Sequence, residues 1–302
     1  MSEYNHKTDL FLEPKTNQYG SHMIMTNVNK QTKTKLINFD TKFRDEYNYL
    51  QTSNYNMTLP ERITDVKSIE VTNIEVPISF YNISSNLGNN YFKVMTTSNG
   101  SPQVITIPDG QYTGSSLATA INTLISRSSY TNLQYIFNGP GSIFKTASSS
   151  VKIEFDIDST GNSDKFNFKS KLGWLLGYRN TIYTVTTANT VSEGIVDLNG
   201  PRYLYLAIDE FNSKGNQNSF ITPTSTSMIN KKVIARLAMN NIMWPYGNLA
   251  SFTHYNGLTT DIRNYTGVVD LLKLNVQLLN ENGIPMQLNG LDFSFLLKVK
   301  HE

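Results

Sequence analysis

Few residues of this chain could carry out chemistry, and they are widely separated. Histidine is the side chain that most often transfers protons near neutral pH, and the chain has four histidines. His6, His22 and His301 lie near the chain ends, where we expect no rigid element to hold them. His254 lies within the sequence SFTHY, without H-x-x-x-H or H-E-x-x-H spacing and without a neighbouring aspartate to orient its ring. We therefore interpret His254 as a structural residue.

The best metal-like pattern is the sequence DIDSTGNSD, from Asp156 to Asp164. Oxygen-bearing side chains at positions 1, 3 and 5, glycine at position 6 and aspartate at position 9 match a calcium-binding loop. Position 12, which is glutamate in such loops, is Asn167, and the flanking sequences VKIEFDI and KFNF have strand patterns. A polar loop between two strands explains the same residues, so we expect no metal site.

Asp209 and Glu210 are adjacent carboxylates at the end of a predicted strand. Neighbouring residues of a strand point to opposite faces, so we expect the pair to be poorly placed to share a substrate. The chain has no G-x-S-x-G, G-x-x-x-x-G-K-[ST] or G-x-G-x-x-G sequence and no cysteine. We therefore expect no catalytic residue and no cofactor, and interpret the protein as a non-enzyme.

Composition allows a sizeable core but does not favour nucleic-acid binding. Of 302 residues, 39% are hydrophobic and 17% charged, which suits one large β domain or two smaller ones. The net charge of +2 and the pI of about 8.5 are too mild to indicate a specific nucleic-acid partner. We find no signal-peptide pattern and no apolar segment long enough for a transmembrane helix.

Short segments that alternate apolar and polar residues recur after residue 36, which is typical of β-strands. The segment Val151–Ile157 alternates throughout and predicts a strand with one buried face. Further strands are predicted at Leu36–Phe39, Tyr55–Leu59, Tyr91–Met95, Gln103–Ile107, Leu133–Phe137, Tyr203–Ile208, Lys232–Leu237, Leu271–Leu279 and Phe293–Val299. Polar sequences at 139–150, 159–164 and 211–231 predict surface loops.

One long segment, from Val66 to Ile78, alternates with interruptions. Its apolar residues change phase between Val66 and Ile69 and again between Val71 and Ile74, which predicts a strand with β-bulges. Pro77 predicts the end of this strand, because proline lacks the N–H that a sheet requires.

Helical patterns are rare. Ser115–Ile125 places Leu117, Ile121, Leu124 and Ile125 on one face, and Lys171–Leu176 fits a short second turn. Because helices do not alternate with strands, the pattern favours an all-β fold. We predict a jelly-roll-like β-sandwich at 36–302 with one or two short inserted helices.

Residues 1–35 have neither strand nor helix periodicity and predict an extended N-terminal arm that a partner could order. Residues that we expect to contact neighbouring chains are the arm residues and two aromatic residues of an apolar, turn-rich segment. They are Phe11, Lys30, Lys33, Lys35, Trp244 and Tyr246.

Five segments together resemble the minor capsid and penton-type proteins of large nucleocytoplasmic DNA viruses and related virophage-like particles. They are INFDTKFRDEY (Ile37–Tyr47), the segment Ser53–Ser84, ITIPDGQYTGSSLATAINTLI (Ile105–Ile125), LGWLLGYR (Leu172–Arg179) and the segment Gly267–Val299. The resemblance rests mainly on the order of these segments along the chain.

The resemblance implies a structural subunit of an icosahedral shell that acts through contacts with neighbouring subunits. It implies partners among other capsid proteins, including the major capsid protein, and a homo-oligomer that is a pentamer if the protein is a penton. The implied location is the virion capsid, assembled in the host cytoplasm. Penton and internal cement positions stay open.

Two other classes of function compete with this interpretation. A carbohydrate-binding or receptor-attachment β-sandwich would use exposed aromatic residues between 244 and 255, namely Trp244, Tyr246, Phe252 and Tyr255. An enzyme on a β scaffold would depend on His254, the one histidine that we expect inside the domain.

Overall fold

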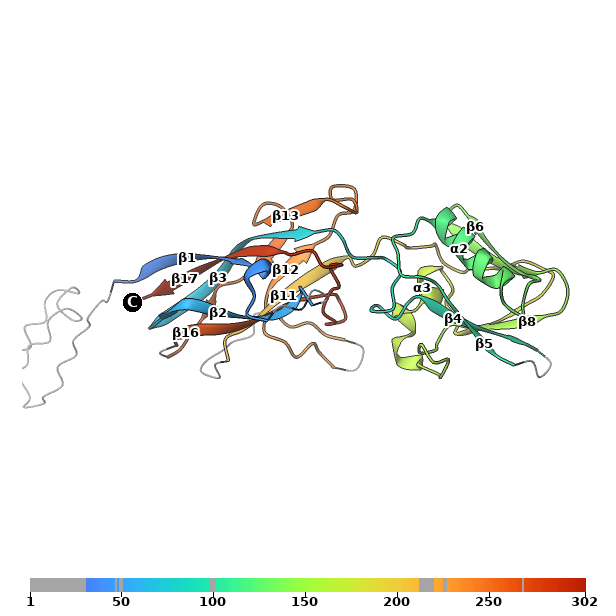
Figure 1. Cartoon of the computed structure of the whole chain (residues 1–302), viewed down its shortest axis with the longest axis horizontal. Coiled ribbons are helices and arrows are strands. Elements are labelled where there is room, and N and C mark those ends of the chain that lie inside the picture. Colours follow the sequence, from blue (N-terminus) through green and yellow to red (C-terminus); the bar gives the residue numbers. More distant parts are fainter. Residues whose placement is uncertain are drawn as a thin grey trace, which may run out of the picture.

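The computed structural model describes residues 31–46, 48, 51–97, 101–211, 220–224, 227–267 and 269–302. Phe11, Lys30, His6 and His22 lie outside the described residues. Figure 1 shows two lobes that lie end to end, with β-sheets in both. Within the described residues, no helix is long and apolar enough to cross a membrane.

The first lobe is a sandwich of two antiparallel sheets. Its eight main strands are β1 (Lys33–Asp40), β2 (Asn54–Ile63), β3 (Val66–Pro77), β11 (Tyr203–Asp209), β12 (Val233–Ala238), β13 (Leu249–Thr253), β16 (Leu271–Leu279) and β17 (Ser294–His301). One sheet has the order β1-β17-β3-β13 and the other β2-β16-β11-β12. Counted in chain order, these strands run 1-8-3-6 and 2-7-4-5, which is the order of a jelly roll. The predicted jelly-roll-like all-β fold is confirmed.

Short elements complete this lobe. The 3₁₀ turn η1 (Thr41–Phe43) follows β1, β14 (Leu258–Thr260) extends the second sheet beside β12, and β15 (Arg263–Asn264) pairs with β3. β1 begins at Lys33, so the sheet starts three residues before the predicted boundary at residue 36.

β3 lies in the middle of its sheet and supplies much of the core. Its inward side chains, among them Ile69, Val71 and Ile74, are completely buried. The pairing of β3 with β17 shifts twice, so that Thr72 and Lys67 have no partner residue opposite them. These are the two bulges predicted from the changes of phase, and they return apolar side chains to the inner face. The strand also ends at Pro77, as predicted.

The second lobe is inserted between β3 and β11 and has a hydrophobic core of its own. Its sheets are β5-β4-β8-β9 and β10-β7-β6. The strands are β4 (Tyr91–Thr96), β5 (Gln103–Thr106), β6 (Leu133–Asn138), β7 (Gly141–Thr146), β8 (Val151–Glu154), β9 (Ile182–Val185) and β10 (Thr190–Val191). The helical elements are α2 (Gly114–Ser126), η2 (Lys165–Ser170) and α3 (Leu172–Leu175).

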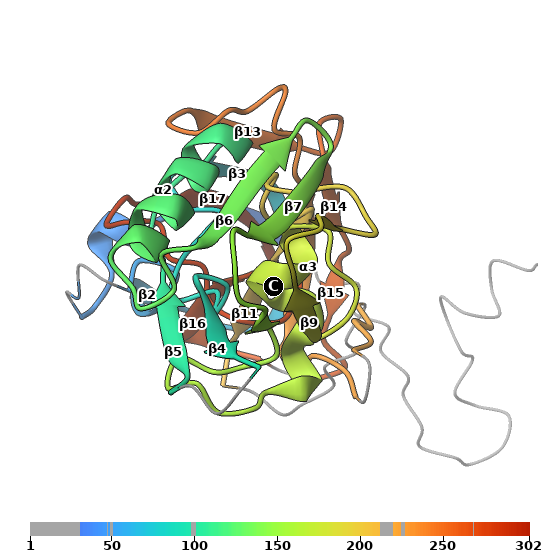
Figure 2. The same cartoon turned by 90° about the vertical axis from the view of Figure 1, so that its right-hand side faces the viewer.

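Helix α2 covers one side of the inserted lobe, next to β6 in Figure 2. Thr113 caps its N-terminus, because the Thr113 side chain accepts from the Ser116 N–H while the Ser116 hydroxyl accepts from the Thr113 N–H. Leu117, Ile121 and Ile125 are buried on one face. The helix predicted at Ser115–Ile125 is therefore confirmed, with one more residue at each end.

One expectation about the middle of the chain differs from the structure. The surface loop predicted at 139–150 is wrong over Gly141–Thr146, which form β7 with Phe144 buried in the lobe core. Within 36–302 the buried apolar residues of the two lobes form separate clusters. Alternation shows which side of a strand is buried but not which other strand covers it. The division into an arm at 1–35 and one domain at 36–302 stays a prediction.

The buried side chain of Asn82 closes the neck of the inserted lobe. Its Nδ2 donates to the carbonyls of Tyr112 and Leu198, both at 2.8 Å, and its Oδ1 accepts from the Tyr112 N–H at 2.9 Å. The chain therefore enters and leaves the lobe at nearly the same point. The side-chain amide of Asn82 holds the two segments together, with both of its N–H groups donating and its oxygen accepting one hydrogen bond.

We predict that the jelly roll folds without the inserted lobe. Replacing residues 83–197 with a Gly-Ser linker of about six residues should leave a cooperatively folded sandwich, since Asn82 and Leu198 are already in contact. Urea unfolding followed by circular dichroism should give one transition with a smaller m-value than that of the full chain. A variant without a cooperative transition would show that the sandwich needs the insertion.

Candidate functional site

The histidines do not form a catalytic arrangement among the described residues. His254 is exposed on the turn between β13 and β14, and its ring meets the ring of Tyr255 edge-on at 5.7 Å. His301 is the last residue of β17 and lies opposite Lys33 of β1 and Val66 of β3. The expectation that nothing rigid holds His301 was wrong, because the C-terminal segment is a central strand of its sheet.

In the loop from Asp156 to Asp164, the carboxylates of Asp158 and Asp164 bind groups of the protein itself. Asp158 accepts from the N–H groups of Thr160 and Asn162 at 2.9 and 3.0 Å. Asp164 instead forms an ion pair with Lys171 at 2.7 Å. Asp156 is buried, and this burial raises the pKa of its carboxyl. Within the described residues, no three His, Cys, Asp or Glu side chains are placed to hold a metal ion together.

The sequence after this loop was expected to be a strand and is instead the 3₁₀ helix η2. The ion pair between Asp164 and Lys171 joins the two ends of this segment, which an extended chain of the same length could not do.

Glu210 belongs to a buried polar cluster that connects the two sheets of the jelly roll. Its carboxylate accepts from the Arg263 guanidinium at 2.7 Å and from the Tyr265 hydroxyl. Arg263 lies on β15, beside β3, yet it also donates to the carbonyls of Ile208 at 2.8 Å and Lys232 at 2.9 Å in the opposite sheet. Burial, followed by the charge of Glu210, raises the pKa of Tyr265, so its hydroxyl remains a donor.

Asp209 and Glu210 differ in exposure, because the Asp209 side chain is 42% exposed and the Glu210 side chain is completely buried. Lys232 Nζ lies 2.7 Å from Asp209 and 3.7 Å from Glu210. β11 ends at Asp209, so the alternation of a strand does not extend to Glu210. Because Lys232 and Arg263 balance their charges, we interpret the pair as part of a structural ion network.

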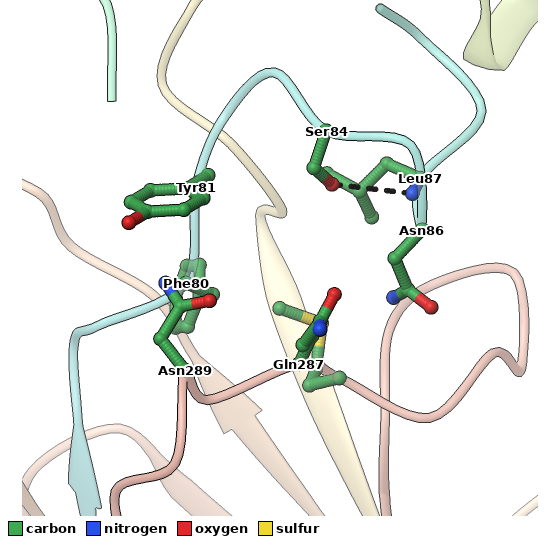
Figure 3. A pocket seen from close by; sticks show the side chains of 8 residues that line it. Phe80, Tyr81, Ser84, Asn86, Leu87, Gln287 and Asn289 are labelled. Carbon is green, nitrogen blue, oxygen red and sulfur yellow. Dashed lines mark hydrogen bonds between the residues drawn. The ribbon is translucent and has the colours of Figure 1, made fainter. Parts of the chain in front are cut away.

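A small pocket lies between the segment 80–87, where the chain leaves the jelly roll, and the loop 286–289 (Figure 3). Ser84 accepts from the Leu87 N–H at 3.3 Å on its rim. The cavity volume of about 10 Å³ is that of a single water molecule, which is too small for a substrate.

The described interface candidates lie in two places on the jelly roll. Lys33 and Lys35 are on β1, where Lys35 forms an ion pair with Glu61. Trp244 is buried and packs on Phe252 with ring centroids 4.5 Å apart, while the exposed Tyr246 stacks on Tyr81. Contact of these residues with other chains stays a prediction, and Trp244 could present only a small part of its ring.

The segment around Trp244 presents an apolar surface. We call it the 242–255 patch and define it by five exposed side chains: Ile242, Met243, Tyr246, Leu249 and Tyr255. They come from the loop between β12 and β13, from β13 and from the turn that follows it, along the edge marked by β13 in Figure 1.

Sequence reasoning identified only the aromatic residues of this patch. Ile242, Met243 and Leu249 were missed, although the chain between Arg236 and Asp261 has no acidic residue, lysine or arginine. This absence of charge was the signal that could have identified the whole surface.

Two solved structures are similar to this chain over nearly its whole length. A mavirus penton protein has 10% sequence identity and a TM-score of 0.40, with 88% of this chain and 99% of the penton chain covered. A chain of the Sputnik virophage has 11% identity and a TM-score of 0.38, with 90% and 98% covered. No protein-family model matches this chain, and no curated protein matches it by sequence.

We predict that the cluster around Glu210 is essential for stability. Arg263→Met would leave the Glu210 carboxylate buried without its main partner, and should lower the free energy of unfolding by about 3–5 kcal/mol. The matched control is Arg202→Met, since Arg202 is exposed and lies 3.8 Å from Asp197, and should cost under about 1 kcal/mol. Urea denaturation of both variants measures the difference, and equal effects would contradict the assignment.

Proposed function

We propose that this protein is a non-enzymatic structural subunit of the capsid of an icosahedral DNA virus, of the penton type. The observation that carries the proposal is the strand order of a jelly roll, found in a chain whose segments resemble penton-type and minor capsid proteins. A fold alone does not define a function, so the resembling segments and the surface must point in the same direction.

The resembling segments meet in the centre of the jelly roll. Ile37–Tyr47 contains the second half of β1, Ser53–Ser84 contains β2 and β3, and Gly267–Val299 contains β16 and most of β17. In the structure β17 lies between β1 and β3, and β16 lies beside β2. Segments that are more than 180 residues apart therefore build the same sheets, as expected if the resemblance concerns one fold.

The two remaining segments belong to the inserted lobe. Ile105–Ile125 contains all but the last residue of α2, and Leu172–Arg179 contains α3 and the buried Tyr178. The resemblance thus extends to the core of the insertion, which supports a common arrangement of both lobes.

The shape of the chain suits a subunit that spans a shell. The C-terminus and the start of β1 lie at the end of the jelly roll that is farther from the inserted lobe (Figure 1). In our proposal the arm contacts neighbouring chains at this end, and the inserted lobe projects from the opposite side of the shell. The partners are further copies, as a pentamer, and the major capsid protein; the location is the virion capsid, with assembly in the host cytoplasm.

The carbohydrate-binding alternative loses part of its basis in the structure. Of the four aromatic residues that it invoked, Trp244 and Phe252 are buried against each other. Tyr246 and Tyr255 remain exposed, but a sugar platform needs flat aromatic faces together with polar groups that orient the ligand.

We predict that the purified chain forms a closed ring of five copies. Light scattering and native mass spectrometry at about 100 µM should show a pentamer, because mass action favours assembly at high concentration. Electron microscopy should show rings. A chain that stays monomeric at every concentration would contradict the penton proposal, and glycan-array binding that is lost in Tyr255→Ala would favour the carbohydrate alternative.

We predict that residues 1–30 strengthen association without being needed for folding. Their deletion keeps β1, which begins at Lys33 and pairs with β17 along its whole length, so the melting temperature should change little. The dissociation constant of the oligomer should rise about tenfold or more, since an arm that becomes ordered on contact adds interface area. A matched truncation to residue 40, which removes β1, should unfold the jelly roll. If the first deletion leaves association unchanged, the arm has no role in assembly.

A further inference from the structure

We propose that the 242–255 patch is the surface through which one copy of this chain contacts a second copy. This inference rests on the proposed function and specifies where on the jelly roll the contact between identical subunits lies.

The patch has the composition of an interface centre. Protein–protein contacts are depleted of charge at their core and enriched in Tyr, Trp, Phe and Met, and the patch contains the exposed residues Tyr246, Tyr255 and Met243. Charged residues stand only at the ends of the segment, as Arg236 and Asp261. The five side chains of the patch therefore come from a segment without Asp, Glu, Lys or Arg.

The exposed apolar area is close to what a stable contact requires. Ile242, Met243, Tyr246, Leu249 and Tyr255 are 96, 54, 45, 64 and 98% exposed. At about 200 Å² for a large side chain, these fractions amount to roughly 700 Å², compared with the roughly 800 Å² that each partner buries in a standard interface. Monomeric proteins rarely leave a patch of this size uncovered.

The loop that carries the patch is already held in place. Asn240 accepts through its side chain from the N–H groups of Ile242 and Met243, at 3.0 and 3.1 Å. The N–H of Gly247 donates to the Ile78 carbonyl at 2.8 Å, which fixes the loop to the end of β3. A surface ordered in advance loses less conformational entropy when it binds, so its apolar area contributes more to affinity.

A second copy fits this surface better than an unrelated partner. Identical chains carry the same net charge of +2, so an uncharged contact surface avoids repulsion between like charges. A partner of different composition would be expected to use charge complementarity for orientation and rate, and the patch offers no charge for it.

The test compares three single substitutions in the full-length chain. Ile242→Asp and Tyr255→Asp place a charge in the patch, while Ile195→Asp makes the same change at an exposed isoleucine of the inserted lobe. All three sites are exposed, so each variant should keep the wild-type melting temperature. The measurement is oligomer mass against concentration, by sedimentation or light scattering.

We expect both patch variants to dissociate with a constant about tenfold or more above that of the wild type, and Ile195→Asp to assemble normally. If the wild type assembles and the patch variants assemble equally well, the patch proposal fails while the proposed function stands. If Ile195→Asp alone dissociates, the contact lies on the inserted lobe and the patch proposal also fails. A wild type that is monomeric throughout overturns both proposals.

Discussion

The pairing of β3 with β17 is the interaction on which the rest of the jelly roll depends. β3 joins β17 on one side and both β13 and β15 on the other, so its twelve residues position most of one sheet. Its inward residues must meet the opposite sheet without a gap, because a buried apolar face is stable only when it is covered. Two bulges achieve this over a long strand: Thr72 and Lys67 have no residue opposite them on β17, so that Val66, Ile69, Val71 and Ile74 are all buried.

Two buried polar sites, at Arg263 and at Asn82, join parts of the chain that apolar packing alone would not hold in one defined arrangement. Arg263 reaches from β15 to the carbonyls near the ends of β11 and β12, and the buried carboxylate of Glu210 balances its charge. Asn82 performs a similar task at the neck of the inserted lobe, where two chain segments pass through the same small space. Both sites stabilise a defined arrangement because a buried donor or acceptor without its partner costs about 1–3 kcal/mol.

Local patterns predicted the strands and the main helix, because burial of one face leaves a period in the sequence. The bulges of β3 and the helix at α2 follow directly from the spacing of apolar residues. The separate core of the insertion could not be predicted, since neither the alternating segment around Phe155 nor the continuous apolar run around Leu204 indicates which cluster the residue joins. The Glu210–Arg263 pair was missed for a similar reason: its members are 53 residues apart, and only the closed sandwich brings them together. Of the patch, only the aromatic residues had attracted attention.

The segment that carries the 242–255 patch contacts both chain segments that connect the inserted lobe to the jelly roll. Tyr81 stacks on Tyr246 of the patch, and the next residue, Asn82, closes the neck. On the other strand of the neck, Asn241 donates to the carbonyl of Asn199. A contact that covers the patch would therefore also restrain the two segments on which the inserted lobe is mounted. In an assembly built through this surface, the lobes of adjacent copies would share one orientation, because the same residues that meet the neighbour also hold the neck.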